Sequence, residues 1–110
     1  MIKMAEIERP WGYYCVIHAV PGMKVKELVV EPFKSLSMQR HFKRNEFWIV
    51  QQGNCDVNLE SNTVPLHLHN TLEIPVGAWH QLTNPYEKPC HIVEIQYGED
   101  CAEEDIERRQ

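Results

Sequence analysis

Short apolar runs, each ended by a turn signal, are the feature that most constrains the fold of this chain. Residues 55–60 are a clear case. Apolar Cys55, Val57 and Leu59 alternate there with polar residues, a period of two that is typical of a half-buried strand. A Gly-Asn pair at 53–54 precedes this run as a hairpin turn. The pattern therefore predicts an all-β protein.

The same pattern divides the chain into short strands joined by tight turns. We expect strands at residues 11–17, 23–31, 36–41, 46–51, 55–60, 63–69, 72–74, 80–83 and 91–97. Residues 103–109 are acidic first and basic last, which suits a helix dipole, so we expect a short terminal helix at 103–110. Short strands of this kind close into a sandwich or a small barrel, the jelly-roll class among others.

Length and composition limit the class of protein. A chain of 110 residues is about one domain, so we expect a single domain over 1–110 with an N-terminal extension at 1–8. The net charge of −5 argues against sequence-independent binding to nucleic acid. We find no signal peptide and no apolar run of the roughly 20 residues that span a membrane. Cysteines without CxxC spacing then predict reduced thiols in a cytoplasmic protein with no nucleic-acid or membrane partner.

One group of polar residues has the spacing of a metal site. Gln39 and His41 are two apart on an expected strand, so their side chains share a face. Glu46 opens the next strand, and His80 begins a strand after the turn at 75–77. A lone histidine on a strand is more often hydrogen-bonded than a ligand, so the joint spacing carries the hypothesis. This mixed nitrogen and oxygen set suits one divalent ion of Zn, Mn, Co, Ni or Fe, with positions left open for substrate.

The expected strand at 91–97 has polar residues on one face. Val93 and Ile95 are apolar, whereas Glu94 and Gln96 alternate with them and face either solvent or a polar cavity. A carboxylate in a partly dry cavity can have its pKa raised towards neutrality and then act as a general base.

Several cations could bind a phosphate group. Lys43 could do so by charge and Arg44 by paired hydrogen bonds, with a solvated turn as the alternative. Arg9 and Lys26 are weaker candidates of the same kind. The His-x-His at 67–69 has no carboxylate at a helpful spacing, so we expect it on an exposed strand.

Two segments resemble the paired motifs of the cupin superfamily. They are Gln39-x-His41-x4-Glu46-x6-Gly53 and Pro75-x-Gly77-x2-His80-x3-Asn84. The match is closer to the isomerase domain of type II phosphomannose isomerases, which is similar at residues 9–14, 24–26, 36–39, 44–48, 94–99 and 104–106. The resemblance runs over residues 9–108. In that family the domain usually follows a mannose-1-phosphate guanylyltransferase domain, for which 110 residues leave no room, so we expect the cupin alone.

The resemblance implies a fold, an activity and a set of roles. It implies a single-domain cupin, a small jelly-roll β-barrel, that acts as a homodimeric, metal-dependent aldose–ketose isomerase converting mannose-6-phosphate to fructose-6-phosphate. The implied metal ligands are Gln39, His41, Glu46 and His80. We assign Glu94 and Lys43 to catalysis, and as substrate contacts we expect Arg44, Lys26, Gln96 and Arg9.

The sequence also departs from these families. Gln39 stands where most cupins have His, but the nearer family has a Gln-x-His arrangement. Phe33 and His69 stand where Gly is usual, and Gly at a turn permits positive φ. Phe42 and Lys43 replace a His-rich stretch at the pocket edge. Two alternatives therefore remain: a non-catalytic cupin that binds a sugar or nucleotide-sugar, or another metal cupin enzyme such as a dioxygenase.

Overall fold

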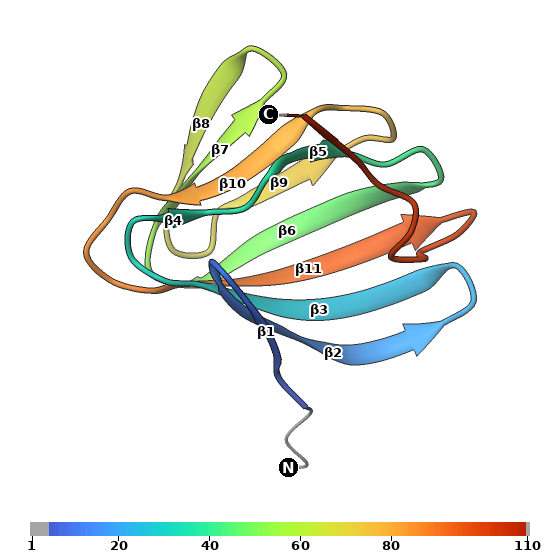
Figure 1. The fold of residues 1–110 in the computed structure, drawn as a ribbon, viewed down its shortest axis with the longest axis horizontal. Helices are drawn as coiled ribbons and strands as arrows, with labels where there is room; N and C mark the ends of the chain where they lie inside the picture. The colour runs from blue at the N-terminus through green and yellow to red at the C-terminus, as the bar shows by residue number, and fades with distance from the viewer. Residues whose placement is uncertain (1–4, 110) are drawn as a thin grey trace.

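The structure, a computed structural model, describes residues 5–109 and builds them into two β-sheets that face each other (Figure 1). The strands are β1 (Ile7–Arg9), β2 (Gly12–Val20), β3 (Met23–Val30), β4 (Lys34–Ser35), β5 (Met38–Arg40), β6 (Arg44–Gln52), β7 (Cys55–Leu59), β8 (Asn62–Leu66), β9 (Thr71–Ile74), β10 (His80–Asn84), β11 (Cys90–Gly98) and β12 (Glu107–Arg109). The all-β prediction is confirmed.

Sequence-distant strands lie side by side in both sheets. Sheet A has the order β1-β2-β3-β11-β6-β9 and sheet B the order β12-β5-β10-β7-β8, with β4 also paired to β10. Antiparallel pairing holds β11, near the C-terminus, between β3 and β6. Within the described residues, no helix is long and apolar enough to cross a membrane.

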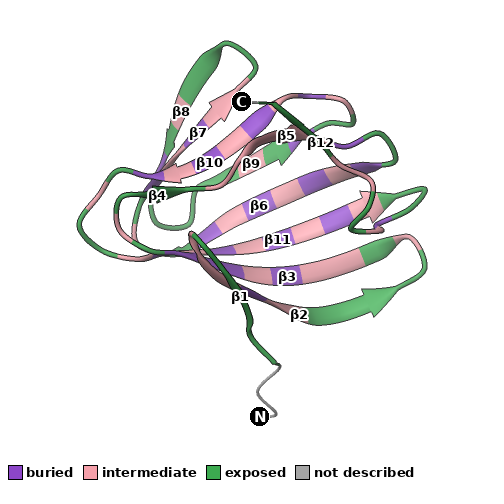
Figure 2. Ribbon diagram, viewed as in Figure 1, coloured by how far each residue is buried: buried purple, intermediate pink, exposed green. Residues whose placement is uncertain are grey.

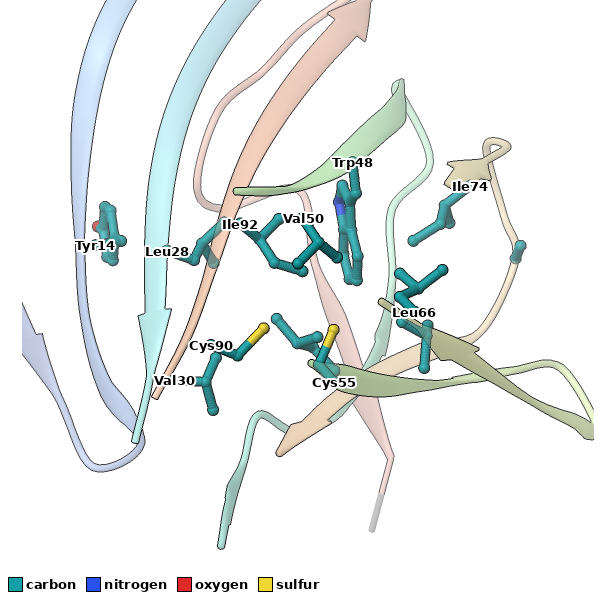
Figure 3. Close-up of a cluster of buried hydrophobic side chains, with 13 residues drawn as sticks. Tyr14, Leu28, Val30, Trp48, Val50, Cys55, Leu66, Ile74, Cys90 and Ile92 are labelled. Atoms are coloured by element: carbon teal, nitrogen blue, oxygen red, sulfur yellow. The ribbon is translucent and has the colours of Figure 1, made fainter. Parts of the chain in front are cut away.

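The space between the sheets is apolar at one end and polar at the other. Along β6 and β11 buried residues alternate with half-buried ones, as expected for strands with one inward face (Figure 2). Cys90 and Ile92 of β11 lie in the core, whereas Glu94 and Gln96 further along the same face are buried polar residues. The apolar cluster draws on both sheets (Figure 3) and comprises Tyr14, Leu28, Val30, Trp48, Val50, Cys55, Val57, Leu66, Ile74, Ala78, Leu82, Cys90 and Ile92.

The terminal helix predicted at 103–110 is wrong for the residues described. Residues 103–104 form a turn and Glu107–Arg109 forms β12, which pairs with β5; Gln110 lies outside the described residues. A segment this short gains little from helix propensity alone, so pairing with a strand edge and contacts to the barrel decide its structure. At the other end, residues 1–4 of the expected extension lie outside the described part, and Ile7–Arg9 pairs with β2.

Two turns have a left-handed backbone at a residue other than glycine. Phe33 has φ 62° and His69 has φ 67°, both in the left-handed region that favours glycine. These are the positions where glycine is usual in the families that the sequence resembles. The chain therefore holds a left-handed backbone at both turns without the residue that adopts it most easily.

Candidate active site

A cavity of about 460 Å³ opens at the polar end of the barrel. Most of the predicted site residues line it, and they come from both sheets: Arg9, Lys26, Gln39, Arg44, Glu46, His80, Glu94 and Gln96. The register explains part of this gathering, because Glu94 lies opposite Lys26 on β3 and opposite Trp48 on β6. Residues directly opposite on one face of a sheet bring their side chains together.

A His–Glu–His group lies within the barrel beside this cavity. His41 follows β5, Glu46 lies on β6 and His80 begins β10, and all three are buried. Their candidate ligand atoms all lie within 4.8 Å of one another. The Nε2 of His41 is 3.2 Å from one Glu46 oxygen, and the Nε2 of His80 is 3.6 Å from the other. Three donors this close could hold a metal ion.

Backbone carbonyls fix the tautomer of both imidazoles. The Nδ1 of His41 is 2.7 Å from the carbonyl oxygen of Asp105, and the Nδ1 of His80 is 2.9 Å from that of Ala78. A carbonyl only accepts, so each Nδ1 carries a proton and donates it. The lone pair of each Nε2 then faces Glu46, which is the arrangement that metal-binding histidines use.

The ionisation of the two histidines also suits a cation. Burial, and then the charge of Arg44, lower the pKa of His41 from 6.5 to about 4. Burial likewise lowers the pKa of His80. Both rings are therefore neutral at pH 7, the form that binds metal. This donor set, two neutral imidazoles and a carboxylate, fits a first-row divalent ion.

Arg44 supplies a positive charge inside this group. Its Nε and Nη2 donate to one oxygen of Glu46 at 3.0 and 2.9 Å, and its Nη2 lies 3.2 Å from the Nε2 of His41. Its Nη1 donates to the carbonyl oxygen of Ala102 at 3.3 Å. The indole of Trp48 donates to the second oxygen of Glu46 at 3.1 Å. A metal ion held by His41 and Glu46 would compete with the guanidinium for the same lone pairs.

Glu94 and Gln96 form a buried pair in the cavity wall. Gln96 donates through Nε2 to Oε1 of Glu94 at 2.7 Å, whereas Oε1 of Gln96 is buried and has no hydrogen-bond partner among the residues that the structure describes. Burial and the negative charge of Glu46 raise the pKa of Glu94 to about 7, although Lys26 and Arg44 act in the opposite direction. The face of β11 that carries Glu94 and Gln96 therefore meets a polar cavity and not solvent.

The remaining predicted residues are placed differently. Gln39 lines the cavity and lies opposite His80 in the register of β5 and β10. His41 is in the His–Glu–His group although it is not part of the cavity wall itself. Lys43 is exposed and does not line the cavity, and Phe42 beside it is also exposed.

Sequence reasoning missed the role of the terminal segment, residues 99–109, of which we had expected 103–110 to be a short helix. The carboxylate of Asp105 accepts from the backbone N–H groups of Phe42 and Lys43 at 3.0 and 2.9 Å. Glu103 forms an ion pair with Lys26 and lines the cavity. Only the resemblance at 104–106 pointed to this segment, because no local spacing rule links it to strands some sixty residues earlier.

The two facing sheets and the His–Glu–His group at one open end define a cupin. The chain belongs to the family described as "Mannose-6-phosphate isomerase C-terminal", whose model matches residues 2–110. Solved structures agree on the fold. The capsular polysaccharide assembling protein CapF from Staphylococcus aureus superposes with a TM-score of 0.82 at 14% identity, covering 100% of this chain and 33% of that one. A cupin-superfamily sugar phosphate isomerase from Silicibacter pomeroyi has a TM-score of 0.72 at 16% identity, covering 77% and 58%.

Curated relatives are longer than this chain. It is 39% identical to alginate biosynthesis protein AlgA of Pseudomonas putida over 94% of its own length and 21% of that protein. It is 40% identical to a mannose-1-phosphate guanylyltransferase of Sinorhizobium fredii over 91% of its own length and 20% of that protein. The chain thus spans about a fifth of the length of these relatives.

Proposed function

We propose that this protein is a metal-dependent aldose–ketose isomerase of a sugar phosphate, with mannose-6-phosphate and fructose-6-phosphate as the pair interconverted. One observation carries the proposal. A buried carboxyl group, Glu94, has a pKa of about 7 and lines the same cavity as Glu46 and His80 of the candidate metal group. Catalytic bases are tuned towards the working pH by this kind of burial.

His41, Glu46 and His80 would hold the metal, with Gln39 as the fourth ligand. When bound, the ion would act as a Lewis acid towards the substrate oxygen on which negative charge develops. The amide oxygen of Gln39 is a neutral, weaker donor than imidazole, so this site would hold its metal less tightly than a three-histidine site. Arg44 would then share Glu46 with the ion, and its bond to the carbonyl oxygen of Ala102 would hold it in place.

Glu94 would move the proton. As a carboxylate it takes the proton from carbon 2 of the aldose, and as the resulting acid it gives the proton to carbon 1. The hydroxyl proton on the oxygen of carbon 2 passes to the oxygen of carbon 1, and the product is the ketose. A pKa of about 7 leaves a substantial share of the group ionised at neutral pH, and the acid form is still strong enough to give the proton back. A divalent ion beside Glu46 would offset the negative charge that raises this pKa and so bring it down.

The substrate contacts come from the cavity wall. We expect Lys26 and Arg9 to meet the phosphate, since both line the cavity and Lys43 does not. The unpartnered Oε1 of Gln96 is a ready acceptor for a sugar hydroxyl. The family to which the chain belongs, and the name of the Silicibacter pomeroyi protein, support a sugar phosphate as the ligand.

A variant of the base tests the proposal. Glu94→Gln keeps an acceptor oxygen for Gln96 but cannot take a proton, so we expect kcat to fall about 100-fold or more with metal content unchanged. Glu99→Gln, at an exposed position just after the same strand, is the matched control and keeps full activity. Full turnover by Glu94→Gln would refute the assignment. A wild-type protein that binds metal and sugar phosphate without turnover would favour the non-catalytic cupin.

We also propose that the protein is a homodimer that pairs through the outer face of sheet A. This face is apolar and half-buried at Val25, Phe47, Ile49, Val93 and Ile95, which lie in neighbouring register positions of β3, β11 and β6. A second copy would cover it. Light scattering on the purified protein checks this, with a dimer expected for the wild type and a monomer for Ile95→Lys. A wild-type monomer would contradict it.

A further inference from the structure

We propose that the carboxylate of Glu103 is an internal anion that occupies the phosphate position of the cavity, and that a ligand phosphate displaces it from Lys26. The substrate class rests on the proposed function. The competition between Glu103 and an anion does not, because it follows from contacts within the chain. It makes Glu103 a residue that sets how tightly the cavity takes an anionic ligand.

Lys26 is a buried cation whose ion pair within residues 5–109 is with Glu103, while Glu94 lies opposite it in the register. Its side chain projects from β3 and is 6% exposed, and its Nζ forms an ion pair with Glu103. The same Nζ lies 4.4 Å from the centre of the Tyr14 ring, a favourable site for a cation. A buried ammonium needs an anionic partner, so the ligand that takes this position must itself carry negative charge.

Glu103 reaches this lysine from outside. Its side chain is 51% exposed and lies on the turn at 103–104, whereas its partner is buried. Lys24 is the second cation here, with its Nζ 3.6 Å from the same Glu103 oxygen and 2.9 Å from the carbonyl oxygen of Cys101. Two lysines around one carboxylate oxygen provide the charge and the donors that a phosphate dianion requires. A half-exposed carboxylate is the partner that can move aside.

The rest of the terminal segment does not need to move. Asp105 stays bound to the N–H groups of residues 42–43 and to His41, and β12 stays paired with β5. Glu107 bonds Arg40 at 2.8 and 2.9 Å but does not line the cavity. Glu103 and Glu107 therefore both tie the segment to the barrel, and only Glu103 competes for a cavity lysine.

This contrast provides the experiment. Calorimetric titration of the purified protein measures its affinity for inorganic phosphate at constant ionic strength and unchanged metal content. Sulfate serves as a second probe that separates binding at the lysines from binding at the metal. We expect Glu103→Gln to bind both anions about fivefold more tightly than wild type. Glu107→Gln removes an ion pair from the same segment and should leave both affinities unchanged. In a Lys26→Met background, Glu103→Gln should no longer tighten binding.

Other outcomes of the titration would overturn the proposal. If Glu103 only props the segment against the barrel, Glu103→Gln will bind phosphate as weakly as wild type or more weakly, and the proposal fails. It also fails if Glu103→Gln and Glu107→Gln tighten binding equally, or if none of the proteins binds either anion. The binding experiment does not depend on turnover. If the protein shows the expected binding pattern but has no isomerase activity, the proposed function is refuted and this inference still stands.

Discussion

Replacing Glu94 with Gln tests whether this carboxyl group is held in the cavity at a cost in stability. In the folded wild type the pKa of Glu94 is raised from 4.5 to about 7. Between these two pH values the folded protein keeps a proton that the unfolded chain has already lost. Its contribution to stability is complete below pH 4.5 and is lost as the pH rises through 7. The side-chain amide of the Glu94→Gln variant does not titrate, so the variant has no such dependence.

The magnitude follows from the size of the pKa change. A rise from 4.5 to about 7 destabilises the charged form in the folded protein by about 3 kcal/mol. The wild type has already lost part of this free energy at pH 5. The free energy of unfolding of Glu94→Gln relative to wild type should therefore grow by about 2 to 3 kcal/mol between pH 5 and pH 8.5. The side-chain amide keeps an oxygen that accepts from Gln96, so the substitution does not leave this N–H donor of Gln96 unpaired.

Urea unfolding, followed by tryptophan fluorescence, to which buried Trp48 contributes, measures the difference at each pH. Chelator is present throughout, because a bound cation would lower the pKa of Glu94. Burial lowers the pKa of His41 and His80 and the charge of Glu94 opposes this, so the difference includes that coupling. Glu99→Gln controls for removing an exposed carboxylate. An equal difference at pH 5 and pH 8.5, or a less stable variant at pH 8.5, would refute the claim that burial raises the pKa of this group.

Other predictions concern the metal ligands and the backbone. His80→Ala removes a buried donor of the His–Glu–His group, so metal affinity should fall at least tenfold by titration; undiminished affinity would remove His80 from the site. Gln39→His replaces a weak donor with imidazole and should tighten metal binding in the same titration, whereas weaker binding would place Gln39 outside the ligand set. Phe33→Gly relieves a left-handed φ of 62° at a side chain that is 68% exposed, and unfolding in urea should show a gain of about 0.5 to 1 kcal/mol. Loss of stability there would mean that Phe33 makes contacts that outweigh the strain.

The strands and the paired motifs could be predicted, but the direction in which one strand faces could not. Alternation separates Glu94 and Gln96 from Val93 and Ile95, yet it does not say which face points inward. The usual rule would place the apolar pair inside. In this barrel the polar pair is buried instead, because the inner face changes along β11 from core to cavity. The motif match, which depends on the whole barrel, was the better guide.

The terminal segment and the phosphate contact show where local patterns fail. The charge order of residues 103–109 favours a helix, but Asp105 and Glu103 bind partners on the loop after β5 and on β3, and these long-range contacts decide the conformation. Lys43 and Arg44 are adjacent in the sequence, so the sequence alone makes them equally good candidates for binding the phosphate. In the structure Arg44 points inward and Lys43 is exposed, because adjacent residues entering a strand face opposite ways.

The central claim is that the metal group and Glu94 together interconvert an aldose and a ketose phosphate. A coupled assay of mannose-6-phosphate isomerisation on the purified protein tests it directly, before and after chelation and after adding back each divalent ion. We expect turnover that is lost with chelator and restored by at least one ion. Turnover that chelator does not affect, or no turnover with the metal bound, would contradict the account.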